Sequence, residues 1–383
     1  MMDMTREKYI EDAKAHFEML LREQLERVDR MKQGATAKSA ADKDVVTIGL
    51  IDGDGIGPLI MNEAKNLLER LLDDDLRSGR VVLKKIEGLT IENRLSLGKS
   101  VPESVLEEIR ECDVLLKGPT ATPKGGTMES ANVTLRRELD LYANVRPVYV
   151  PELGIDWTFY RENTEGEYVL GSRGVELGPD MAVDFKVITD AGTERIARAA
   201  FEFAKNNGKS SVSIVTKANI MKKTDGKFSE ICHRVAADYP DIKAEDWYVD
   251  IMAANLVNPS IRSDFQVFVL PNLYGDIITD EAAEIQGGVG TAGSANIGDR
   301  YAMFEAIHGT APRMIEDGLQ DYVNPLSIFK AAEMMLRHIG RVEKAEKLKA
   351  ALDMAQSPEA PKVTGFRDGA TTKELLEYLY KNL

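Results

Sequence analysis

Hydrophobic residues recur every three or four positions over residues 3–31, which predicts one long amphipathic helix. The repeating positions are Ile10, Ala13, Phe17, Leu20, Leu21, Leu25, Val28 and Met31. Acidic and basic residues fill the other face, and the many acids argue against a mitochondrial presequence. We expect this helix to pack on its own domain in preference to pairing with a partner helix. Residues 33–44 follow it as a predicted linker.

From Val45 onward, short apolar runs alternate with amphipathic segments. This alternation predicts an α/β sheet with helices on its faces. Residues 167–189 break the pattern with short runs separated by glycine and proline, which indicates a hairpin-like β insertion. The predicted strands cover 45–51, 81–88, 113–119, 211–217 and 265–272, and the clearest predicted helices cover 58–72, 104–111 and 192–208.

The composition indicates a globular protein and argues against a membrane protein or a nucleic-acid-binding protein. The chain has 383 residues, enough for two domains, and its 43% hydrophobic and 29% charged residues are typical of a globular protein. No apolar run approaches the roughly 20 residues that a membrane span needs, so we expect no membrane role. A formal net charge of −14 makes nucleic acid an improbable partner. Two widely separated cysteines, Cys112 and Cys232, indicate a reducing, cytoplasmic compartment.

A glycine-rich turn follows the first predicted strand. Gly53, Gly55 and Gly57 have the spacing G-x-G-x-G and are followed at once by Pro58, which does not match the dinucleotide-binding fingerprint. A tight strand-to-helix turn therefore explains these glycines at least as well as a phosphate cradle does.

Polar side chains that suit carboxylate ligands gather around residues 130–161. Ser130 precedes a helix that begins near Ala131, and Asn132 and Arg136 fall four residues apart on one helix face. Arg146 and Arg161 add two further cations. A single arginine is most often a solvated surface residue, but three in such apolar segments indicate a site that binds an anion.

Candidate acids and a candidate base follow predicted strands further along the chain. Lys217 stands at the end of a strand, where open α/β sheets place functional side chains, although a surface lysine is an equally good interpretation. Asp276 and Asp280 lie four apart on a predicted helix, and acids are also common there for simple helix-dipole reasons. Together with Asp250 they form an oxygen-ligand set suited to Mg²⁺ or Mn²⁺.

A loop rich in small residues lies near residue 308. His308 precedes Gly309, and small residues allow a cofactor to approach the backbone. On its own, His308 would be interpreted as an ordinary loop histidine.

Taken in order, eight motifs resemble the β-decarboxylating dehydrogenases that act on isocitrate, isopropylmalate and homoisocitrate. They are GDGIGP, LKGPTATP, LRRELDLYANVRP, RENTEGEY, KANIMK, NLYGDIITD, GSANIGD and EAIHGTAP. The resemblance runs from about Val45 to the C-terminus. It implies a non-Rossmann α/β fold of the isocitrate/isopropylmalate dehydrogenase type, with a large domain, a small domain and a β clasp. The implied boundaries are 1–44 for an N-terminal extension, 45–141 with 287–383 for the large cofactor-binding domain, 142–165 with 190–286 for the small domain, and 166–189 for the clasp.

The same resemblance implies roles for particular residues. The implied catalytic residues are Tyr168 and Lys217, the substrate-binding residues are Ser130, Asn132, Arg136, Arg146 and Arg161, and the metal ligands are Asp250, Asp276 and Asp280. The implied cofactor-binding residues are Lys117, Thr122, Asn219, Glu305, His308, Gly309, Thr310, Ala311, Arg313 and Asn324. Lys217 and Asp250 would come from the neighbouring subunit, so the implied enzyme is a homodimer with shared active sites.

The implied reaction is the oxidative decarboxylation of isocitrate to 2-oxoglutarate with NAD or NADP and Mg²⁺ or Mn²⁺. The resemblance favours isocitrate over isopropylmalate, because members of the family that act on isocitrate carry Ser and Asn at the positions of Ser130 and Asn132, whereas isopropylmalate dehydrogenases carry apolar residues at these positions. Arg313 stands where NAD-dependent members have an aspartate, and its guanidinium slightly favours NADP. The alternatives are a homoisocitrate or isopropylmalate dehydrogenase, and a non-catalytic regulatory subunit. Phosphorylation of Ser130 would block the substrate carboxylate by charge repulsion.

Overall fold

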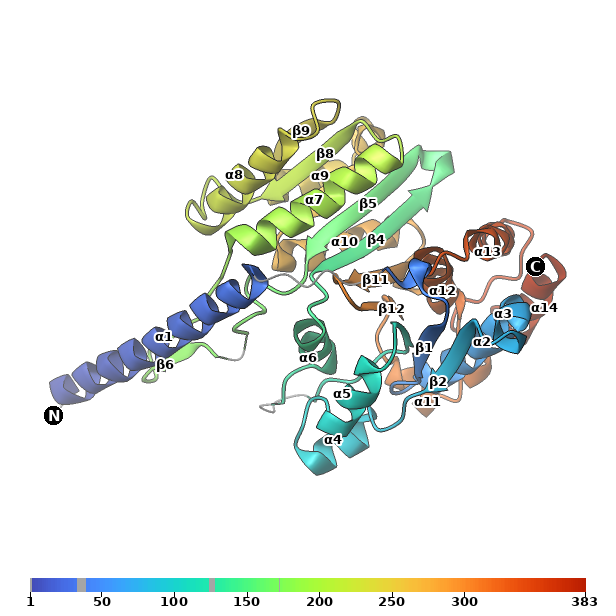
Figure 1. Cartoon of the computed structure of the whole chain (residues 1–383), viewed down its shortest axis with the longest axis horizontal. Coiled ribbons are helices and arrows are strands. Elements are labelled where there is room, and N and C mark those ends of the chain that lie inside the picture. Colours follow the sequence, from blue (N-terminus) through green and yellow to red (C-terminus); the bar gives the residue numbers. More distant parts are fainter. Residues whose placement is uncertain (1, 33–38, 124–127, 172) are drawn as a thin grey trace. The chain divides into compact units, whose positions relative to one another are not determined.

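The predicted alternation of strands and helices is present in the computed structural model, which describes residues 2–32, 39–123, 128–171 and 173–383. The chain divides into two units, each of which mixes helices with strands (Figure 1). Unit 1 comprises residues 1–36 and 159–278, and unit 2 comprises residues 37–158 and 279–383. These limits do not assign functions, so the predicted domain boundaries stay predictions.

Unit 2 holds most of the sheet and the C-terminal helices. Its strands are β1 (Val46–Ile51), β2 (Val81–Lys85), β3 (Val114–Lys117), β4 (Ala143–Val150), β11 (Gly293–Ile297) and β12 (Ala302–Ala306). Its α-helices are α2 (Gly57–Leu71), α3 (Asp73–Arg77), α4 (Ile91–Leu97), α5 (Glu103–Arg110), α6 (Ala131–Glu138), α11 (Pro312–Glu316), α12 (Leu326–His338), α13 (Val342–Ala355) and α14 (Thr372–Lys381). Short 3₁₀ turns are η1 (Ala40–Asp42), η2 (Pro151–Leu153), η4 (Val289–Thr291) and η5 (Gln320–Tyr322).

The strands of unit 2 run in the order β2-β1-β3-β12-β11-β4. The pairs β1–β2, β1–β3 and β3–β12 are parallel, whereas β11 is antiparallel to both β12 and β4. Two hydrophobic clusters form the core. Val114 and Leu116 of β3 belong to one cluster, and Leu115 belongs to the other. Because the two clusters lie on opposite faces of β3, this strand begins with a continuous apolar run, VLL, and is buried throughout.

Unit 1 contains a second group of strands in the order β5-β10-β8-β9, and β8 is parallel to both β10 and β9. Its elements are α1 (Met2–Lys32), β5 (Ile155–Glu162), β6 (Val175–Leu177), β7 (Met181–Val183), α7 (Asp190–Asn206), β8 (Ser211–Thr216), α8 (Thr224–Ala236), β9 (Lys243–Tyr248), α9 (Val249–Leu256), η3 (Arg262–Asp264), β10 (Val267–Leu270) and α10 (Asn272–Ile285). The first half of β5 and the last half of α10 belong to unit 2. The predicted insertion over 167–189 is confirmed as the antiparallel hairpin β6–β7.

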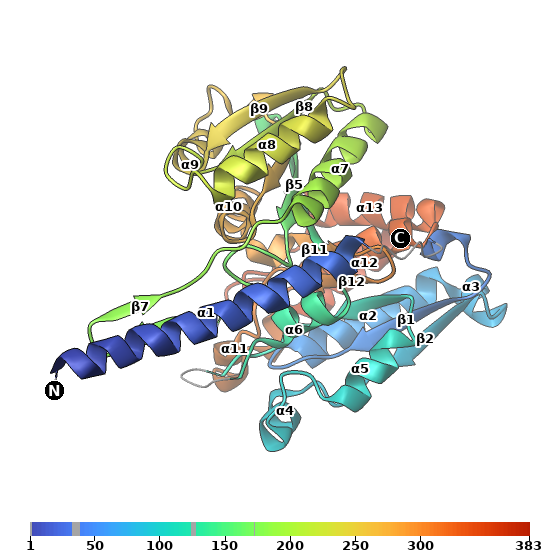
Figure 2. The same cartoon turned by 60° about the vertical axis from the view of Figure 1, so that its left-hand side comes forward.

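The long N-terminal helix is confirmed as α1. It packs against β6 and α7 in its own unit, as predicted, and Figure 2 shows it running beside the hairpin. Leu20 is buried, whereas Leu25 is 65% exposed. Residues 33–38 of the predicted linker lie outside the described residues. Later in the same segment, Ala40 of η1 is buried in the core of unit 2.

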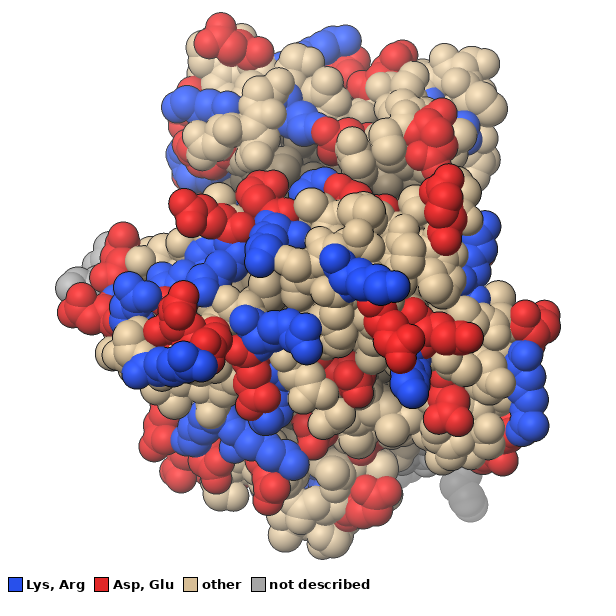
Figure 3. Space-filling view, turned by 90° about the vertical axis from the view of Figure 1, so that its right-hand side faces the viewer, with Lys and Arg blue, Asp and Glu red and all other residues tan. Residues whose placement is uncertain are grey.

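The surface carries charged side chains of both signs. Lysine and arginine side chains are interspersed with aspartate and glutamate over the face shown in Figure 3. Within the described part of the chain, every helix is too short or too polar to span a lipid bilayer. Both cysteines are free and buried.

Candidate active site

Arg161 and Asp276 form the centre of a polar cluster in unit 1. Arg161, at the end of β5, is 1% exposed and donates from Nη1 to the Asp276 carboxylate. Its Nε and Nη2 both donate to Asn272 Oδ1, at 3.0 and 2.7 Å. The hydroxyl of Tyr168 donates to the other Asp276 oxygen at 2.7 Å. The structure thus brings together a predicted substrate arginine, a predicted metal ligand and the predicted catalytic tyrosine.

The start of α10 is shaped to admit the Arg161 side chain. A Cβ atom on Gly275 would lie 2.5 Å from Arg161 Cγ, a distance that real Cβ atoms essentially never show. Glycine at this position therefore allows the guanidinium stem to lie directly against the helix. Asn272, the first residue of α10, then holds the guanidinium from the same helix.

Lys217 and Asp250 form a second pair in unit 1. Lys217 follows β8 and Asp250 lies in the first turn of α9, just after β9. Thr216 of β8 is the register partner of Tyr248 of β9, so the carboxyl ends of these parallel strands meet. Lys217 Nζ lies 2.5 Å from Asp250 Oδ1, and this hydrogen bond lowers the pKa of the Asp250 carboxyl.

Arg146 binds the second acid of α10. In unit 2, Arg146 Nη1 donates to Asp280 Oδ1 at 2.9 Å and to Thr279 Oγ1 at 2.6 Å. The Arg146 side chain is 8% exposed and that of Asp280 is 59% exposed. Arg146 thus holds this carboxylate at the protein surface, where a ligand has access to it.

The acids of α10 suit a hard divalent cation. Asp276 and Asp280 lie four residues apart on one helix and therefore on one face. Mg²⁺ commonly uses one or two carboxylates and fills its other positions with water and substrate oxygens, so this donor set fits. In the residues that the structure describes, no three acidic, histidine or cysteine side chains converge into a metal-holding group. The third predicted metal ligand, Asp250, contacts Lys217.

A buried ion cluster in unit 2 joins three predicted site residues. Glu305 Oε2 lies 3.1 Å from Lys117 Nζ, and Glu305 Oε1 lies 3.2 Å from Arg136 Nη2. Burial alone would raise the pKa of Glu305, but the two cations outweigh it and hold this pKa at about 2. Burial also lowers the pKa of Lys117. Arg136 Nε is buried without a hydrogen-bond partner among the described residues, so it has a donor left for a ligand.

The start of α6 presents uncharged polar groups. Ser130 occupies the N-cap position, as predicted, but its side chain makes no capping hydrogen bond. Asn132 Oδ1 accepts a hydrogen bond from Thr120 Oγ1 at 3.0 Å. The Ser130 hydroxyl is therefore not used to stabilise the helix, and it is only partly buried.

The glycine-rich turn serves backbone packing. A Cβ atom on Gly53 would lie 2.2 Å from the Pro119 carbonyl oxygen, and one on Gly55 would lie 2.1 Å from that of Thr310. Both glycines have positive φ values, 75° and 60°. The turn thus packs directly against the loop that holds Thr310, which favours the tight-turn interpretation over a phosphate cradle.

Several predicted cofactor residues share this loop in unit 2. His308 Nδ1 contacts the Gly309 carbonyl at 3.0 Å, and burial lowers the pKa of the His308 imidazole, which favours its neutral form. Ala311 has a φ of 43°, uncommon for a residue other than glycine. Arg313 is exposed on α11, and its side chain makes no ion pair or hydrogen bond with any residue that the structure describes.

Three further predicted cofactor residues lie elsewhere in the fold. Asn324 is used in part to start α12, because its Oδ1 accepts from the Leu326 amide at 3.0 Å. Thr122 lies in the loop after β3, and Asn219 lies in the turn after β8; both are exposed. Their roles stay predictions.

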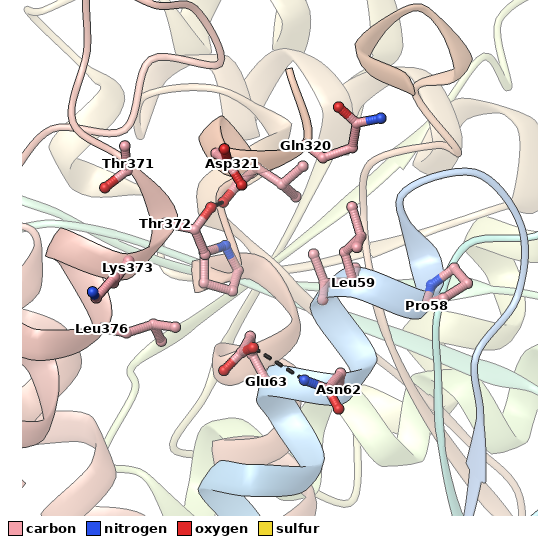
Figure 4. A pocket seen from close by; sticks show the side chains of 13 residues that line it. Pro58, Leu59, Asn62, Glu63, Gln320, Asp321, Thr371, Thr372, Lys373 and Leu376 are labelled. Atoms are coloured by element: carbon pink, nitrogen blue, oxygen red, sulfur yellow. Dashed lines mark hydrogen bonds between the residues drawn. The ribbon is translucent and has the colours of Figure 1, made fainter. Parts of the chain in front are cut away.

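A pocket of about 730 Å³ lies elsewhere in unit 2. Figure 4 shows its lining side chains, among them Leu59 of α2 and Leu376 of α14, and the hydrogen bond from Asn62 to Glu63. Among the described residues that line it, Val323 and Pro325 flank Asn324, but none is a predicted site residue. Arg313 is not part of its wall.

Sequence reasoning missed residues that hold the site together. Asn272 binds Arg161, Thr279 binds Arg146, and Asn296 donates to Glu305 Oε1 at 2.8 Å. Asn272 and Thr279 lie on the same helix as the predicted acids. Their spacing from Asp276 and Asp280 along that helix could therefore have identified them. Asn296 lies on β11, and its contact with Glu305 depends on strand order.

Comparisons with known proteins agree with this architecture. A family described as isocitrate/isopropylmalate dehydrogenase matches residues 47–377. A 3-isopropylmalate dehydrogenase of Archaeoglobus fulgidus is 40% identical over 320 residues, which cover 80% of this chain and 90% of that protein. A probable mitochondrial NAD isocitrate dehydrogenase subunit alpha of Caenorhabditis elegans is 38% identical over 316 residues, which cover 79% and 84%. Other relatives are named NADP isocitrate dehydrogenase and homoisocitrate dehydrogenase.

A solved structure extends the likeness to the fold. The crystal structure of isocitrate dehydrogenase from Methylococcus capsulatus is 33% identical and has a TM-score of 0.77, over 88% of this chain and 99% of that one. The predicted fold of this type is thereby confirmed. The family match begins at residue 47, so helix α1 lies before it.

Proposed function

The chain belongs to the isocitrate/isopropylmalate dehydrogenase family, and from that premise we propose that it oxidises and decarboxylates isocitrate to 2-oxoglutarate and CO₂. The observation that carries the choice of substrate is the polar start of α6, where the Ser130 hydroxyl is not used for capping. Relatives act on several 2-hydroxy acids by name, so the substrate has to be argued from side chains.

The γ-substituent is what distinguishes isocitrate from isopropylmalate. A carboxylate needs hydrogen-bond donors when it leaves water, whereas an isopropyl group needs apolar surroundings. The hydroxyl of Ser130 and the amide of Asn132 supply donors at the start of a helix, whose dipole also favours an anion. This pairing of side chains supports isocitrate.

We assign the other substrate carboxylates to three arginines. Arg136 has a buried Nε without a partner among the described residues. Arg146 and Arg161 are each held by an acid and a neutral oxygen of α10. Fixed guanidinium groups bind carboxylates with two parallel hydrogen bonds and lose little side-chain entropy in doing so.

Asp276 and Asp280 would hold a Mg²⁺ or Mn²⁺ ion, with Asp250 of a neighbouring subunit as the third acid. Bound there, the cation would supply Lewis acidity at the substrate C2 oxygen. Asp276 and Asp280 each have an arginine partner, so the protein already balances these two negative charges. We also propose a homodimer in which Lys217 and Asp250 serve the site of the other subunit.

Two protons have to move for the reaction to balance. The C2 hydroxyl loses a proton while hydride leaves C2 for the nicotinamide, and we assign Lys217 as the acceptor. In this structure its Nζ contacts Asp250, the acid proposed to serve the same site. After CO₂ leaves, Tyr168 gives a proton to the carbon that carried it. Its hydroxyl already donates to Asp276, which places it beside the proposed metal ligand.

NADP is the proposed cofactor. The guanidinium of Arg313 is exposed and without a partner among the described residues, so it can bind a 2′-phosphate. The neutral imidazole of His308, in the same loop, would lie at the adenine. Lys117 and Glu305 are assigned a supporting role on the cofactor side because their ion pair is almost entirely buried.

Steady-state kinetics of the purified chain would test this function. The substrates are threo-isocitrate, isopropylmalate and homoisocitrate, each with Mg²⁺ and with either cofactor. We expect kcat/KM for isocitrate to exceed the other values by roughly 10²-fold or more, since a site built for a polar group discriminates strongly. Faster turnover of isopropylmalate would overturn the substrate assignment. Isocitrate binding without any turnover would instead indicate a regulatory subunit.

A further inference from the structure

Helix α1 forms a buried ion pair with the segment that carries Tyr168. Arg27 Nη2 lies 2.7 Å from Glu165 Oε1; the Glu165 side chain is fully buried and that of Arg27 is 16% exposed. These residues are 138 positions apart in the sequence. A charge pair of this kind costs desolvation energy, and loss of one partner leaves the other buried and unpaired.

Glu165 is also fixed from two other sides. Its carboxylate accepts from the Thr189 amide at 2.9 Å and from Thr189 Oγ1 at 2.5 Å, which ties it to the start of α7. A Cβ atom on Gly192 would lie 2.4 Å from Glu165 Cδ, so glycine leaves the space that this carboxylate occupies. The Glu165 carbonyl accepts from Asn272, the residue that also binds Arg161.

The same helix holds the far end of the segment. Arg173 donates from both Nη atoms to the two oxygens of Glu23, at 2.5 and 3.0 Å. His16 Nε2 donates to the Arg173 carbonyl at 2.9 Å. Phe17 stacks on Phe185, which follows β7, with ring centroids 5.2 Å apart. Contacts from α1 therefore bracket the chain on both sides of Tyr168.

We propose that α1 holds Glu165 and Arg173, on either side of Tyr168, in place, so that Arg27 and Glu23 are positioning residues for the proton that Tyr168 returns. This inference rests on the proposed function. Tyr168 lies three residues after Glu165, and its hydroxyl reaches Asp276 at 2.7 Å only while this segment keeps its position. Helix α1 lies before residues 47–377, the part of the chain that matches the family.

The charges around Glu165 predict how a defect would depend on pH. Glu162 is also buried; burial and the charge of Glu165 raise its pKa to about 7. The cations near this pair are Arg27 from α1 and Arg195 from α7, which donates to Thr164 Oγ1 at 3.0 Å. Without Arg27, the doubly ionised pair would be less well compensated. The segment should then be least stable at high pH, where both carboxylates are charged.

The test uses the full chain with three substitutions of α1. Arg27→Met removes the buried pair, Arg27→Lys retains its charge, and Arg22→Met is the matched control because Arg22 contacts exposed Glu18 and no other acid among the described residues. We expect Arg27→Met to lower kcat for isocitrate roughly tenfold or more while KM changes little, because Tyr168 acts after binding. The defect should grow as pH rises through about 7. Arg27→Lys should recover most of the kcat, and Arg22→Met should match the unaltered chain.

Hydrogen exchange of the amides over residues 165–173 gives a readout that needs no turnover. We expect faster exchange in Arg27→Met and unchanged exchange in Arg22→Met. Equal exchange in all variants, or a kcat defect that is the same at every pH, would overturn the inference. If the unaltered chain oxidises another substrate of the family, the proposed function fails while the kinetic comparison continues with that substrate. If it has no turnover, the exchange comparison alone decides.

Discussion

Arg161 binds one oxygen of the Asp276 carboxylate, and the hydroxyl of Tyr168 binds the other. One acid thus connects a buried cation with a tyrosine that can move a proton. Four residues further along α10, Asp280 has the equivalent partner in Arg146. The helix therefore carries two acids whose charges are balanced by guanidinium groups. These guanidinium groups stabilise the ionised carboxylates when no metal cation is bound to them.

Replacement of Asp280 by asparagine should weaken the metal site. We expect Asp280→Asn to reduce Mn²⁺ affinity and kcat/KM for isocitrate by roughly 10²-fold, because a charged oxygen ligand is lost. Titration calorimetry with Mn²⁺ measures the first effect and steady-state kinetics the second. Glu284→Gln is the matched control, since Glu284 is exposed on the same helix. Metal-dependent turnover that survives Asp280→Asn would mean that the metal assignment is wrong.

Tyr168→Phe should separate proton return from substrate binding. The ring and its packing remain, whereas the hydroxyl that donates to Asp276 is lost. General acid catalysis is worth about 10²- to 10⁴-fold, so we expect a fall of kcat in that range with little change in KM. Tyr149→Phe serves as the control, because Tyr149 is 49% exposed and lies outside the proposed site. An unchanged kcat would remove Tyr168 from the mechanism.

The buried cluster around Glu305 predicts a specific acid sensitivity. The folded-state pKa of about 2 lies below the ordinary value of 4.5, so this carboxylate stabilises the fold above pH 4.5. That contribution is lost as pH falls from 4.5 toward 2. Glu305→Gln should remove this dependence. At pH 7 it should also destabilise the protein by about 3 to 5 kcal/mol, because the buried Lys117 and Arg136 would lose the carboxylate that compensates their charges.

Urea unfolding at pH 7, 4 and 3 would measure both effects. Glu69→Gln is a suitable control, because Glu69 pairs with Lys65 at the surface and such pairs contribute about 1 kcal/mol or less. Equal stability losses in the two variants would contradict the importance of the buried cluster.

The sequence predicted those features of the site that depend on the spacing of residues within one helix or strand. Asp276 and Asp280 share a helix face because they are four residues apart, and Lys217 follows a strand because the apolar run ends there. The pairing of Lys117 with Glu305 depends instead on sheet order. These residues are register partners on β3 and β12, strands separated by almost half the chain, and no local pattern states which strands become neighbours.

The same limit explains a further contact that the sequence did not predict. The contact from Arg27 to Glu165 joins residues 138 positions apart, and each alone looks like an ordinary charged residue. Strand β9 was expected from EDWYV, the residues before Asp250, although its sequence KAEDWY is largely polar at the edge of the sheet. The strand at the other edge, β2, was likewise predicted, over 81–88. Local patterns thus identify strands even at the edges, whereas long-range ion pairs require the assembled fold.

Arg313→Asp tests the cofactor preference. The guanidinium lies on α11 directly after the loop with His308, and no described residue neutralises it. A 2′-phosphate would gain a charge-assisted hydrogen bond from it, worth about 1.5 to 3 kcal/mol, whereas an aspartate would repel the phosphate and could accept from a ribose hydroxyl. We expect the ratio of kcat/KM for NADP to that for NAD to fall by roughly 10²-fold. The matched control is Arg300→Asp, because Arg300 lies in the turn before β12. If both substitutions leave the ratio unchanged, Arg313 does not determine the cofactor, and the preference for NADP loses its physical basis.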